Sequence, residues 1–149
     1  MKKNVIIRFS EEKDLKDLPW LYRQYYNGDS GIETDFDKMI EKYRELSVNK
    51  DYKFVSAICN DKLVGFCSAV INQDILDKQR PLIFLWHLRV APNFRKMGIG
   101  KAIVEFIEKY GKTINADYTL LSCDADNEGA CRFYDKIGYD RAFSFYKYL

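Results

Sequence analysis

Apolar residues recur along this chain with two different periods, and the changes between them outline the expected elements. A short apolar run over Val5–Phe9 predicts a first strand. Two longer runs, Lys53–Cys59 and Leu63–Ile71, predict a β-hairpin, because the turn signal Asn60-Asp61-Lys62 lies between them. The densest apolar run, Leu82–Val90, predicts a central strand.

Other segments place their apolar side chains at helical spacing. The first covers residues 11–27 and contains Pro19, so the helix either kinks there or begins near Asp17 as its N-cap. A second helix is expected to begin after Asp35. The clearest amphipathic pattern covers residues 98–112, with one apolar face and one face of lysines and glutamates.

Beyond this helix the chain carries a strand pattern, a further helix and an alternating end. Ala116–Cys123 predicts a strand, and Asn127 is placed to cap a helix that ends at about Ile137. Gly138 suits the left-handed position that follows many helices. Tyr139–Leu149 alternates enough to predict one or two final strands. The order β-α-α-β-β-β-α-β-α-β predicts an α/β fold with a mixed sheet and helices on its faces.

Composition narrows the class of protein and its partners. With 149 residues, 47% of them apolar, we expect one domain over residues 1–149. The net charge of +2 gives no broad surface for nucleic acid. Apolar runs are too short for a membrane span or a signal peptide, so we expect a cytoplasmic protein without a membrane partner. The aromatic segment Phe143–Tyr148 could present an edge for a homodimer.

The four cysteines give no metal-binding pattern. They form no C-x-x-C pair, and His87 is the only histidine that could join them, so we expect no metal. Cys59 and Cys67 flank the expected hairpin, where buried, reduced thiols are the simplest interpretation.

The strongest chemical signal is the turn between the central strand and the amphipathic helix. Gly98 and Gly100 stand there beside three cationic residues, Arg95, Lys96 and Lys101. A glycine-rich turn that leads into a helix N-terminus can bind an anion, because the first amides have no helical partner and the helix dipole adds positive charge. The alternative is a flexible strand–helix turn that binds nothing.

Three phosphate-binding templates compete for this turn. A nucleotide P-loop needs Ser or Thr after its lysine, where this chain has Ala102, and a dinucleotide fingerprint needs a third glycine where Ile103 stands. The pattern R/Q-x-x-G-x-G/A is matched in full by Arg95, Gly98 and Gly100. This pattern resembles motif A of the GNAT N-acyltransferase superfamily, which binds the pyrophosphate of acetyl-CoA. A nucleotide-binding domain is the alternative.

A second motif lies one strand and one turn further along the chain. Residues 127–139 are similar to the closing GNAT motif, N-x-x-A-x-x-F-Y-x-x-x-G-F/Y. All of its fixed positions are present, namely Asn127, Ala130, Phe133, Tyr134, Gly138 and Tyr139. The resemblance covers residues 53–139 well, whereas residues 1–50 match only in layout.

The resemblance implies the GNAT fold, a mixed and mostly antiparallel sheet of six to seven strands flanked by about four helices. Two middle strands would splay apart, and acetyl-CoA would enter between them with its pantetheine paired to the backbone near Leu88 and Val90. Asn127 would hold the pantetheine arm. The residues around the pyrophosphate would be Arg95, Lys96, Gly98, Ile99, Gly100 and Lys101.

The resemblance also implies acetyl transfer to a primary amine of a small molecule or peptide, directly within a ternary complex. Tyr134 would stand near the thioester sulfur and protonate the leaving thiolate, and its alternative role is a core aromatic. Cys123 and Cys131 make an acyl-cysteine route conceivable, although no histidine lies near them in sequence. A non-catalytic acyl-CoA-binding module is the alternative function.

The general base is where the sequence departs from the commoner family pattern, which places Glu or Asp on the strand before motif A. Here that strand offers only His87, whose ordinary pKa of about 6.5 would suit a base. Alternation puts His87 on the face opposite Phe84 and Trp86, which are expected to face the cleft, so a bulge would be needed to bring it there. The alternatives are a packed histidine and a water relay along the strand carbonyls.

In this family the acceptor pocket is usually built by the first two helices and their loop. That region combines carboxylates with aromatic rings, a set that suits a cationic amine. The residues are Asp29, Glu33, Asp35, Asp37, Trp20, Tyr22, Tyr25 and Tyr26. The alternative is a solvated loop beside core aromatics.

Overall fold

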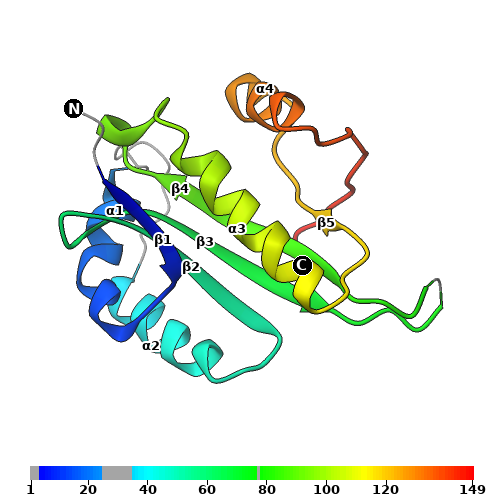
Figure 1. Ribbon diagram of the computed structural model, residues 1–149, viewed down its shortest axis with the longest axis horizontal. Helices are drawn as coiled ribbons and strands as arrows, with labels where there is room; N and C mark the ends of the chain where they lie inside the picture. Colours follow the sequence, from blue (N-terminus) through cyan, green and yellow to red (C-terminus); the bar gives the residue numbers. More distant parts are fainter. Residues whose placement is uncertain (1–3, 25–34, 77) are drawn as a thin grey trace.

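The computed structural model describes residues 4–24, 35–76 and 78–149, and these form one curled sheet with helices on both faces (Figure 1). The strands lie in sequence order, antiparallel except for the parallel last pair. Their bounds are β1 (Val5–Phe9), β2 (Tyr52–Cys59), β3 (Lys62–Asn72), β4 (Leu82–Val90) and β5 (Thr119–Leu120).

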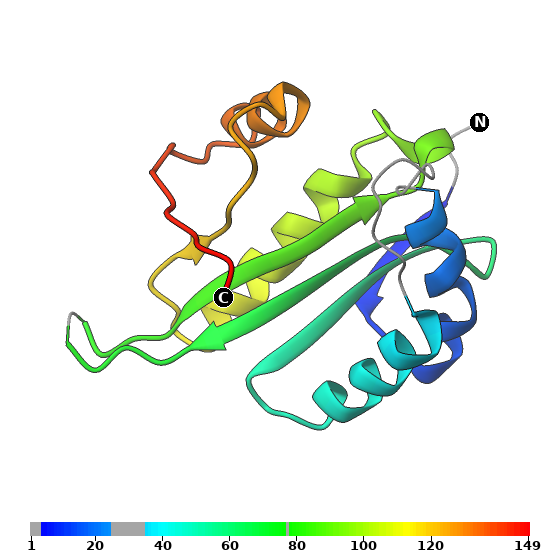
Figure 2. The ribbon, with the colours of Figure 1, turned by 180° about the vertical axis from the view of Figure 1, so that it is seen from behind.

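The described residues also form four α-helices and two short 3-10 turns. Helix α3 crosses one face of the sheet, and α1 and α2 cover the other, as the two opposite views show (Figures 1 and 2). No helix in the described ranges is long and apolar enough to cross a membrane. The bounds are η1 (Glu12–Asp17), α1 (Leu18–Arg23), α2 (Phe36–Ser47), η2 (Pro92–Phe94), α3 (Ile99–Thr113) and α4 (Glu128–Lys136).

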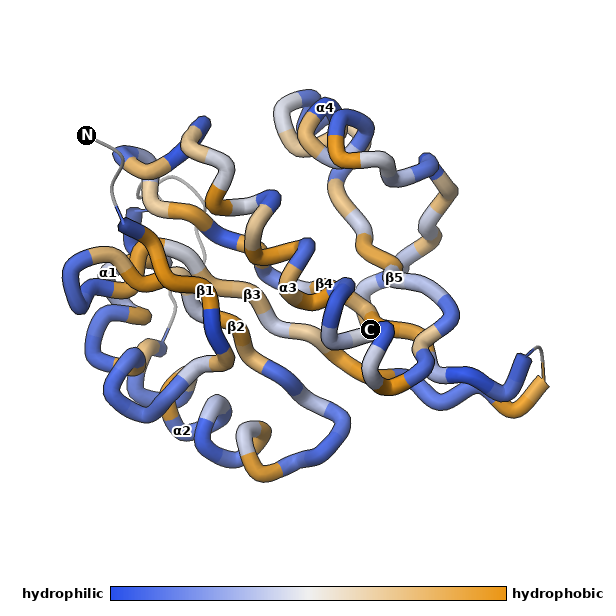
Figure 3. The backbone as a smooth tube through the Cα atoms, viewed as in Figure 1, coloured by the Kyte–Doolittle hydropathy of each residue, from blue (hydrophilic) through white to orange (hydrophobic). Residues whose placement is uncertain are grey.

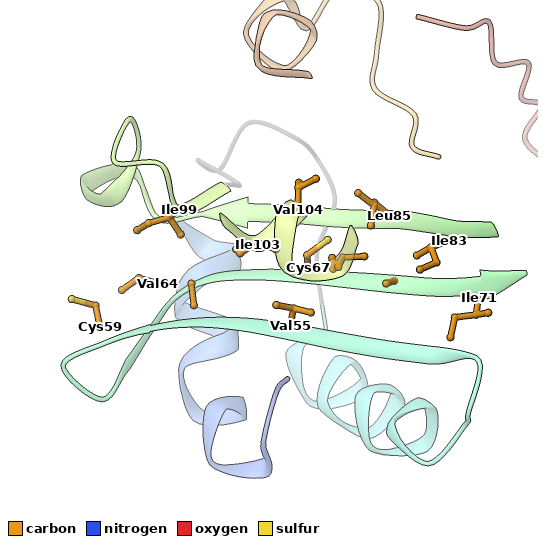
Figure 4. Close-up of a cluster of buried hydrophobic side chains, with 13 residues drawn as sticks. Val55, Cys59, Val64, Cys67, Ile71, Ile83, Leu85, Ile99, Ile103 and Val104 are labelled. Atoms are coloured by element: carbon orange, nitrogen blue, oxygen red, sulfur yellow. The ribbon is translucent and has the colours of Figure 1, made fainter. Parts of the chain in front are cut away.

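Strand alternation divides the apolar side chains between two cores. On one face, Val55 and Cys67 meet Ile103 of α3, and all three are fully buried (Figure 4). On the other face, Phe66 packs with Leu18 of α1. Apolar and polar residues are mixed along helix α3, and its buried residues recur at the three- to four-residue spacing of a helix with one buried face (Figure 3).

Local sequence signals explain the turns around the sheet. Asn60 and Asp61 have φ values of +49° and +59°, which give a two-residue hairpin turn between β2 and β3. The Asp35 side chain accepts a hydrogen bond from the Lys38 amide at 3.1 Å, so it caps α2 as predicted.

The segment around Pro19 follows one of the two predicted alternatives. Instead of one kinked helix, η1 ends at Asp17 and α1 begins at the next residue, with Pro19 in its first turn. Asp17 does not cap α1 with its side chain, because its carboxylate accepts a hydrogen bond from the Leu63 amide at 3.1 Å. This bond ties the start of α1 to β3.

The C-terminal part differs from the expectation. The strand predicted over Ala116–Cys123 is reduced to two residues, and Tyr139–Leu149 forms no strand, so the sheet has five strands and not six to seven. The predicted aromatic edge at Phe143–Tyr148 is therefore not a strand edge. Alternation is not sufficient for a strand, because the backbone also needs a neighbour to pair with. Strand β5 pairs over only two residues, and the side chains after Asp140 are all exposed.

Candidate active site

The two parallel strands are joined at one end only. Strand β5 pairs with β4 at Ile83 and Phe84, and no pair follows. Residues 85–90 of β4 therefore have a free edge on the side where β5 leads on to α4. The predicted separation of the two middle strands is confirmed.

Strand β4 contains a β-bulge at His87. Ser68 pairs with Trp86 and Phe66 pairs with Arg89, so two residues of β4 stand opposite one residue of β3. His87 adopts φ +55°, a left-handed value that is uncommon outside glycine. Because of the extra residue, His87 lines the same cavity as Trp86 instead of facing away from it.

This cavity has a volume of about 700 Å³ and lies between the sheet and helices α1 and α2. Most of its walls are aromatic or aliphatic. The lining residues are Leu18, Tyr22, Met39, Lys42, Tyr43, Leu46, Tyr52, Phe54, Phe66, Ser68, Val70, Asn72, Phe84, Trp86 and His87. The sequence interpretation missed the part of this wall that β2 and β3 contribute. The signal was present in the even-numbered apolar residues of both strands, but their face could not be assigned without knowing which helix covers it.

Four carboxylates were expected around the acceptor, and the two that the structure describes, Asp35 and Asp37, do not line this cavity. Asp35 is used as the cap of α2, and Asp37 is exposed on that helix. Of the expected aromatics, Tyr22 lines the cavity, whereas the ring of Trp20 lies under the Lys62 ammonium at 3.6 Å. The other expected residues, Tyr25, Tyr26, Asp29 and Glu33, lie outside the described residues.

The turn from β4 to α3 has the backbone of an anion site. Gly98 is the N-cap residue of α3, with φ +80°, and Lys96 is also left-handed, with φ +59°. The first helical hydrogen bond runs from the Ala102 amide to the Gly98 carbonyl at 2.9 Å, so the preceding amides have no partner within the helix. A Cβ atom on Gly98 would meet no atom within 4 Å, so the turn is open on the side where that atom would lie.

Gly100 is required for a different reason from Gly98. A Cβ atom there would lie 3.2 Å from Cζ of Phe133 and 3.8 Å from Cγ2 of Val90. The Phe133 side chain of α4 therefore reaches the first turn of α3. The two sequence motifs meet in space at this contact.

The other residues predicted around the pyrophosphate lie on this turn with different exposures. Arg95, Lys96 and Lys101 are exposed, and Lys101 Nζ lies 3.6 Å from Oε1 of Glu105. The side chain of Ile99 is buried in the core under α3. Ile99 can therefore offer a ligand only its backbone amide.

Carbonyl groups along the free half of β4 accept hydrogen bonds from side chains. The Leu88 carbonyl accepts from Nη1 of Arg89 at 2.9 Å, and the Val90 carbonyl accepts from Nε of Arg95 at 3.1 Å. Each carbonyl has two lone pairs, so a pantetheine amide could still donate to it. Arg95 thus connects the strand edge to the anion-type turn.

Tyr134 lies half-buried on α4, with its ring 5.7 Å from the ring of Tyr139. Burial raises the pKa of Tyr134, and the nearby thiols of Cys67 and Cys123 raise it further. The phenol therefore keeps its proton at neutral pH and can donate it. Asn127 caps the same helix, since its Oδ1 accepts a hydrogen bond from the Ala130 amide at 3.2 Å.

His87 is neutral at physiological pH. Partial burial against the cavity wall lowers its pKa to about 4, and the nearby Arg89 guanidinium contributes to the same shift. Its ring lies 5.3 Å from the ring of Trp86, and its backbone carbonyl accepts a hydrogen bond from the Tyr22 hydroxyl at 3.3 Å. A neutral imidazole at the cavity can accept a proton, although a pKa this low makes it a weak base.

The cysteines fall into two groups. Cys59 and Cys67 are buried and free, as predicted, and burial raises the pKa of Cys67 to about 12. Cys123 and Cys131 are also free, with their sulfur atoms 3.6 Å apart, a proximity that the sequence did not reveal. Burial and the Cys131 thiol raise the pKa of Cys123, which disfavours the thiolate that an acyl-cysteine route needs.

Comparisons with known proteins agree with this geometry. The family described as the acetyltransferase (GNAT) family matches residues 14–139. An uncharacterized N-acetyltransferase of Methanocaldococcus jannaschii is 28% identical over 147 residues, which cover 93% of this chain and 62% of that protein. The chain thus spans about three-fifths of the length of this relative.

Solved structures share the fold at lower identity. A transcriptional regulator from Bacillus halodurans has a TM-score of 0.87 at 18% identity, covering 98% of this chain and 99% of that one. An aminoglycoside N-acetyltransferase in complex with CoA has a TM-score of 0.84 at 18% identity, covering 100% of this chain and 96% of that one. Since the family match covers most of the sequence, the chain belongs to the acetyltransferase (GNAT) family.

Proposed function

We propose that residues 1–149 form one domain that transfers an acetyl group from acetyl-CoA to a primary amine of a small molecule or peptide, directly in a ternary complex. One arrangement carries this proposal. The free half of β4 leads from the bulge at His87, beside the cavity, to the amide-rich turn at Gly98. A thioester could therefore lie along one strand edge with its phosphates at one end and its acetyl group at the other.

The phosphate end would be held mainly by backbone amides of Gly98, Ile99, Gly100 and Lys101. Each hydrogen bond to a charged group contributes roughly 1.5–3 kcal/mol. Several such bonds would supply much of the binding free energy of a micromolar complex, about 8 kcal/mol. The charges of Arg95, Lys96 and Lys101 would add to the attraction. The pantetheine arm would pair with the β4 backbone at Leu88 and Val90, with Asn127 on its other side.

The chemical step first requires a neutral amine. A lysine-like amine with a pKa of about 10.4 is neutral in only about 1 of 2,500 molecules at pH 7, a cost of about 4.6 kcal/mol. Neutral His87 would accept the ammonium proton directly or through a water molecule. Because His87 is a weak base, we assign part of this work to the apolar cavity, which lowers the pKa of the amine itself by desolvation.

The neutral amine would then attack the thioester carbonyl carbon. A C–N bond forms and the nitrogen loses its second proton to water, while the C–S bond breaks and its electron pair leaves with sulfur. Tyr134 would give its phenolic proton to the departing thiolate and regain a proton from solvent. The phenol is protonated when the thiolate forms, and because its raised pKa makes it a weak acid, it stabilises the departing sulfur by hydrogen bonding until the proton is transferred.

A non-catalytic acyl-CoA-binding module is the second candidate. One observation favours it, namely that β4 carries no carboxylate between Leu82 and Val90 that could serve as a strong base. The test is release of free CoA thiol from acetyl-CoA in the presence of a library of amines, with calorimetry of acetyl-CoA binding alongside. Amine-dependent release supports the enzyme. Binding of acetyl-CoA without release for any amine supports the module, and absence of binding contradicts both.

The free thiols of the cysteines indicate in which cellular compartment the protein is found. All four are free, two of them buried and two with sulfur atoms 3.6 Å apart. Thiols this close persist most readily where glutathione keeps them reduced. We therefore propose a cytoplasmic location.

A further inference from the structure

We infer that the acceptor amine is attached to an aromatic or branched apolar group, and that polycationic amines are poor acceptors. This inference rests on the proposed function, because it names the class of molecule that occupies the cavity beside the β4 bulge.

The first support is the wall of the cavity. Phe54 and Phe66 stack with ring centroids 5.8 Å apart, and the rings of Phe84 and Trp86 lie 5.0 Å apart on the neighbouring strand. Tyr43 of α2 approaches Phe54 at 4.6 Å from the helix side. All five rings line the cavity, and apolar walls of this kind bind flat or branched apolar groups by burial and by offset or edge-on ring contacts.

The second support is the distribution of charge. Among the residues that the structure describes, no carboxylate lines the cavity, and Lys42 is the one lysine or arginine that does. Its ammonium is exposed and lies 2.6 Å from Oε2 of Glu45. A molecule with several ammonium groups would lose hydration in this cavity without gaining counter-charges.

The third support is the position of the polar groups. At the bulge, His87 and Ser68 face the cavity, and the Ser68 hydroxyl donates a hydrogen bond to the Trp86 carbonyl at 2.9 Å. A molecule with one amine and an apolar body can therefore place its nitrogen at the bulge and its body against Phe54 and Val70. This orientation puts the amine at the same end as the proposed base.

The volume also fits this class of molecule. A cavity of about 700 Å³ lies within the range of roughly 300–1,000 Å³ typical of small-ligand sites. The same chemistry could come from a free arylalkylamine or from the N-terminal residue of a peptide that begins with an aromatic side chain. The test therefore includes one substrate from each source.

The experiment compares kcat/KM for 2-phenylethylamine, a peptide beginning with phenylalanine, spermidine and kanamycin, all with saturating acetyl-CoA. We expect at least one aromatic substrate to exceed both polycations by roughly tenfold or more. A higher kcat/KM for 2-phenylethylamine would identify a free arylalkylamine as the acceptor, and a higher value for the peptide would identify a peptide N-terminus. Acetyl-CoA binding with spermidine or kanamycin as the better acceptor overturns this inference while leaving the proposed function intact. Absence of acetyl-CoA binding overturns the proposed function itself.

Binding is measured separately from turnover, by NMR saturation transfer from the protein to 2-phenylethylamine with CoA present. We expect transfer to the aromatic ring protons for the wild-type protein and its loss in Trp86→Ala. Trp86 is 48% exposed, so its truncation leaves the core intact. The matched control is Tyr118→Ala, which removes an aromatic ring that is 52% exposed and does not line the cavity.

A third variant tests the charge argument by adding the missing carboxylate. Val70→Glu places an acid on the cavity wall, and we expect the ratio of kcat/KM for 2-phenylethylamine to that for spermidine to fall by roughly tenfold. The KM for acetyl-CoA should stay unchanged in all three variants. Absence of saturation transfer in the wild type, or equal loss of it in Trp86→Ala and Tyr118→Ala, overturns the inference.

Discussion

The ring of Phe133 closes over Gly100, so that a Cβ atom at position 100 would lie 3.2 Å from Cζ of the ring. This contact joins the turn proposed to bind phosphate to the helix that carries Tyr134. The next residue along α4 after Phe133 is Tyr134 itself, with the two rings 5.0 Å apart. Any change that pushes Phe133 away from α3 should therefore also move the proposed acid.

Gly100→Ala should lower kcat strongly while the protein still folds. The added methyl group meets Phe133 at less than ordinary contact distance, and we expect a cost of about 1–3 kcal/mol in folding free energy. A shift of Tyr134 from its position should lower kcat by roughly 10- to 100-fold. Thermal unfolding and thiol-release kinetics measure the two effects.

Gly98→Ala is the matched control for this substitution. Its Cβ would enter open space, but the residue has φ +80°, so we expect a backbone cost of about 1–2 kcal/mol. Helix α4 should stay in place, and kcat at saturating acetyl-CoA should fall much less than in Gly100→Ala. Wild-type kcat in Gly100→Ala would show that the two motifs are not coupled through Phe133.

Tyr134→Phe removes the phenolic proton while keeping the ring. We expect kcat to fall by roughly 100-fold or more, because the leaving thiolate loses its acid. The Kd for acetyl-CoA should change by no more than about twofold, since the hydroxyl acts on the leaving group and not on the phosphates. An unchanged kcat with a good amine acceptor would remove Tyr134 from the mechanism.

His87 should affect stability in weak acid. Its pKa is about 4 in the folded protein and about 6.5 in the unfolded chain, so the unfolded chain binds its proton first as pH falls. Between these values the free energy of unfolding rises with pH, and the contribution of the neutral imidazole is lost towards pH 4. His87→Gln should flatten this part of the profile, as measured by urea unfolding at a series of pH values. A profile of unchanged slope would mean that the surroundings of His87 do not favour its neutral form.

Cys123→Ser combined with Cys131→Ser tests the direct route. The raised pKa of Cys123 disfavours a thiolate nucleophile, so we expect kcat to stay within about twofold of wild type and no acetylated cysteine by mass spectrometry. Loss of turnover together with an acetyl adduct on either residue of the wild-type protein would establish an acyl-cysteine intermediate instead.

Local patterns in the sequence were enough to predict much of the fold. The strand Leu82–Val90 was placed at its observed bounds, and the caps at Asp35 and Asn127 were found from residue type and position. The bulge at His87, which the sequence left open as one of several alternatives, is present. Each of these features depends on neighbours along the chain or on one adjacent strand, which is why sequence reasoning reached them.

Features that depend on distant partners were predicted less well. Tyr139–Leu149 has a strand pattern but pairs with no other strand, and alternation cannot reveal that lack. Of the carboxylates that one of the two interpretations placed around the acceptor, Asp35 and Asp37 do not line the cavity, whereas Phe54 and Phe66 of the sheet do. Which face of a strand meets which helix is a property of the whole fold.

Calorimetry of acetyl-CoA binding tests the central claim most directly, namely that the amides between Arg95 and Lys101 bind the diphosphate of a CoA thioester. S-acetylpantetheine, which has the same thioester and arm but lacks the diphosphate and the adenosine 3′-phosphate attached to it, is the comparison ligand. We predict a Kd for acetyl-CoA in the micromolar range, on the order of 1–100 µM, and binding of S-acetylpantetheine at least about 100-fold weaker. Equal affinities for the two ligands, or no heat with acetyl-CoA and correctly folded protein, would contradict the account.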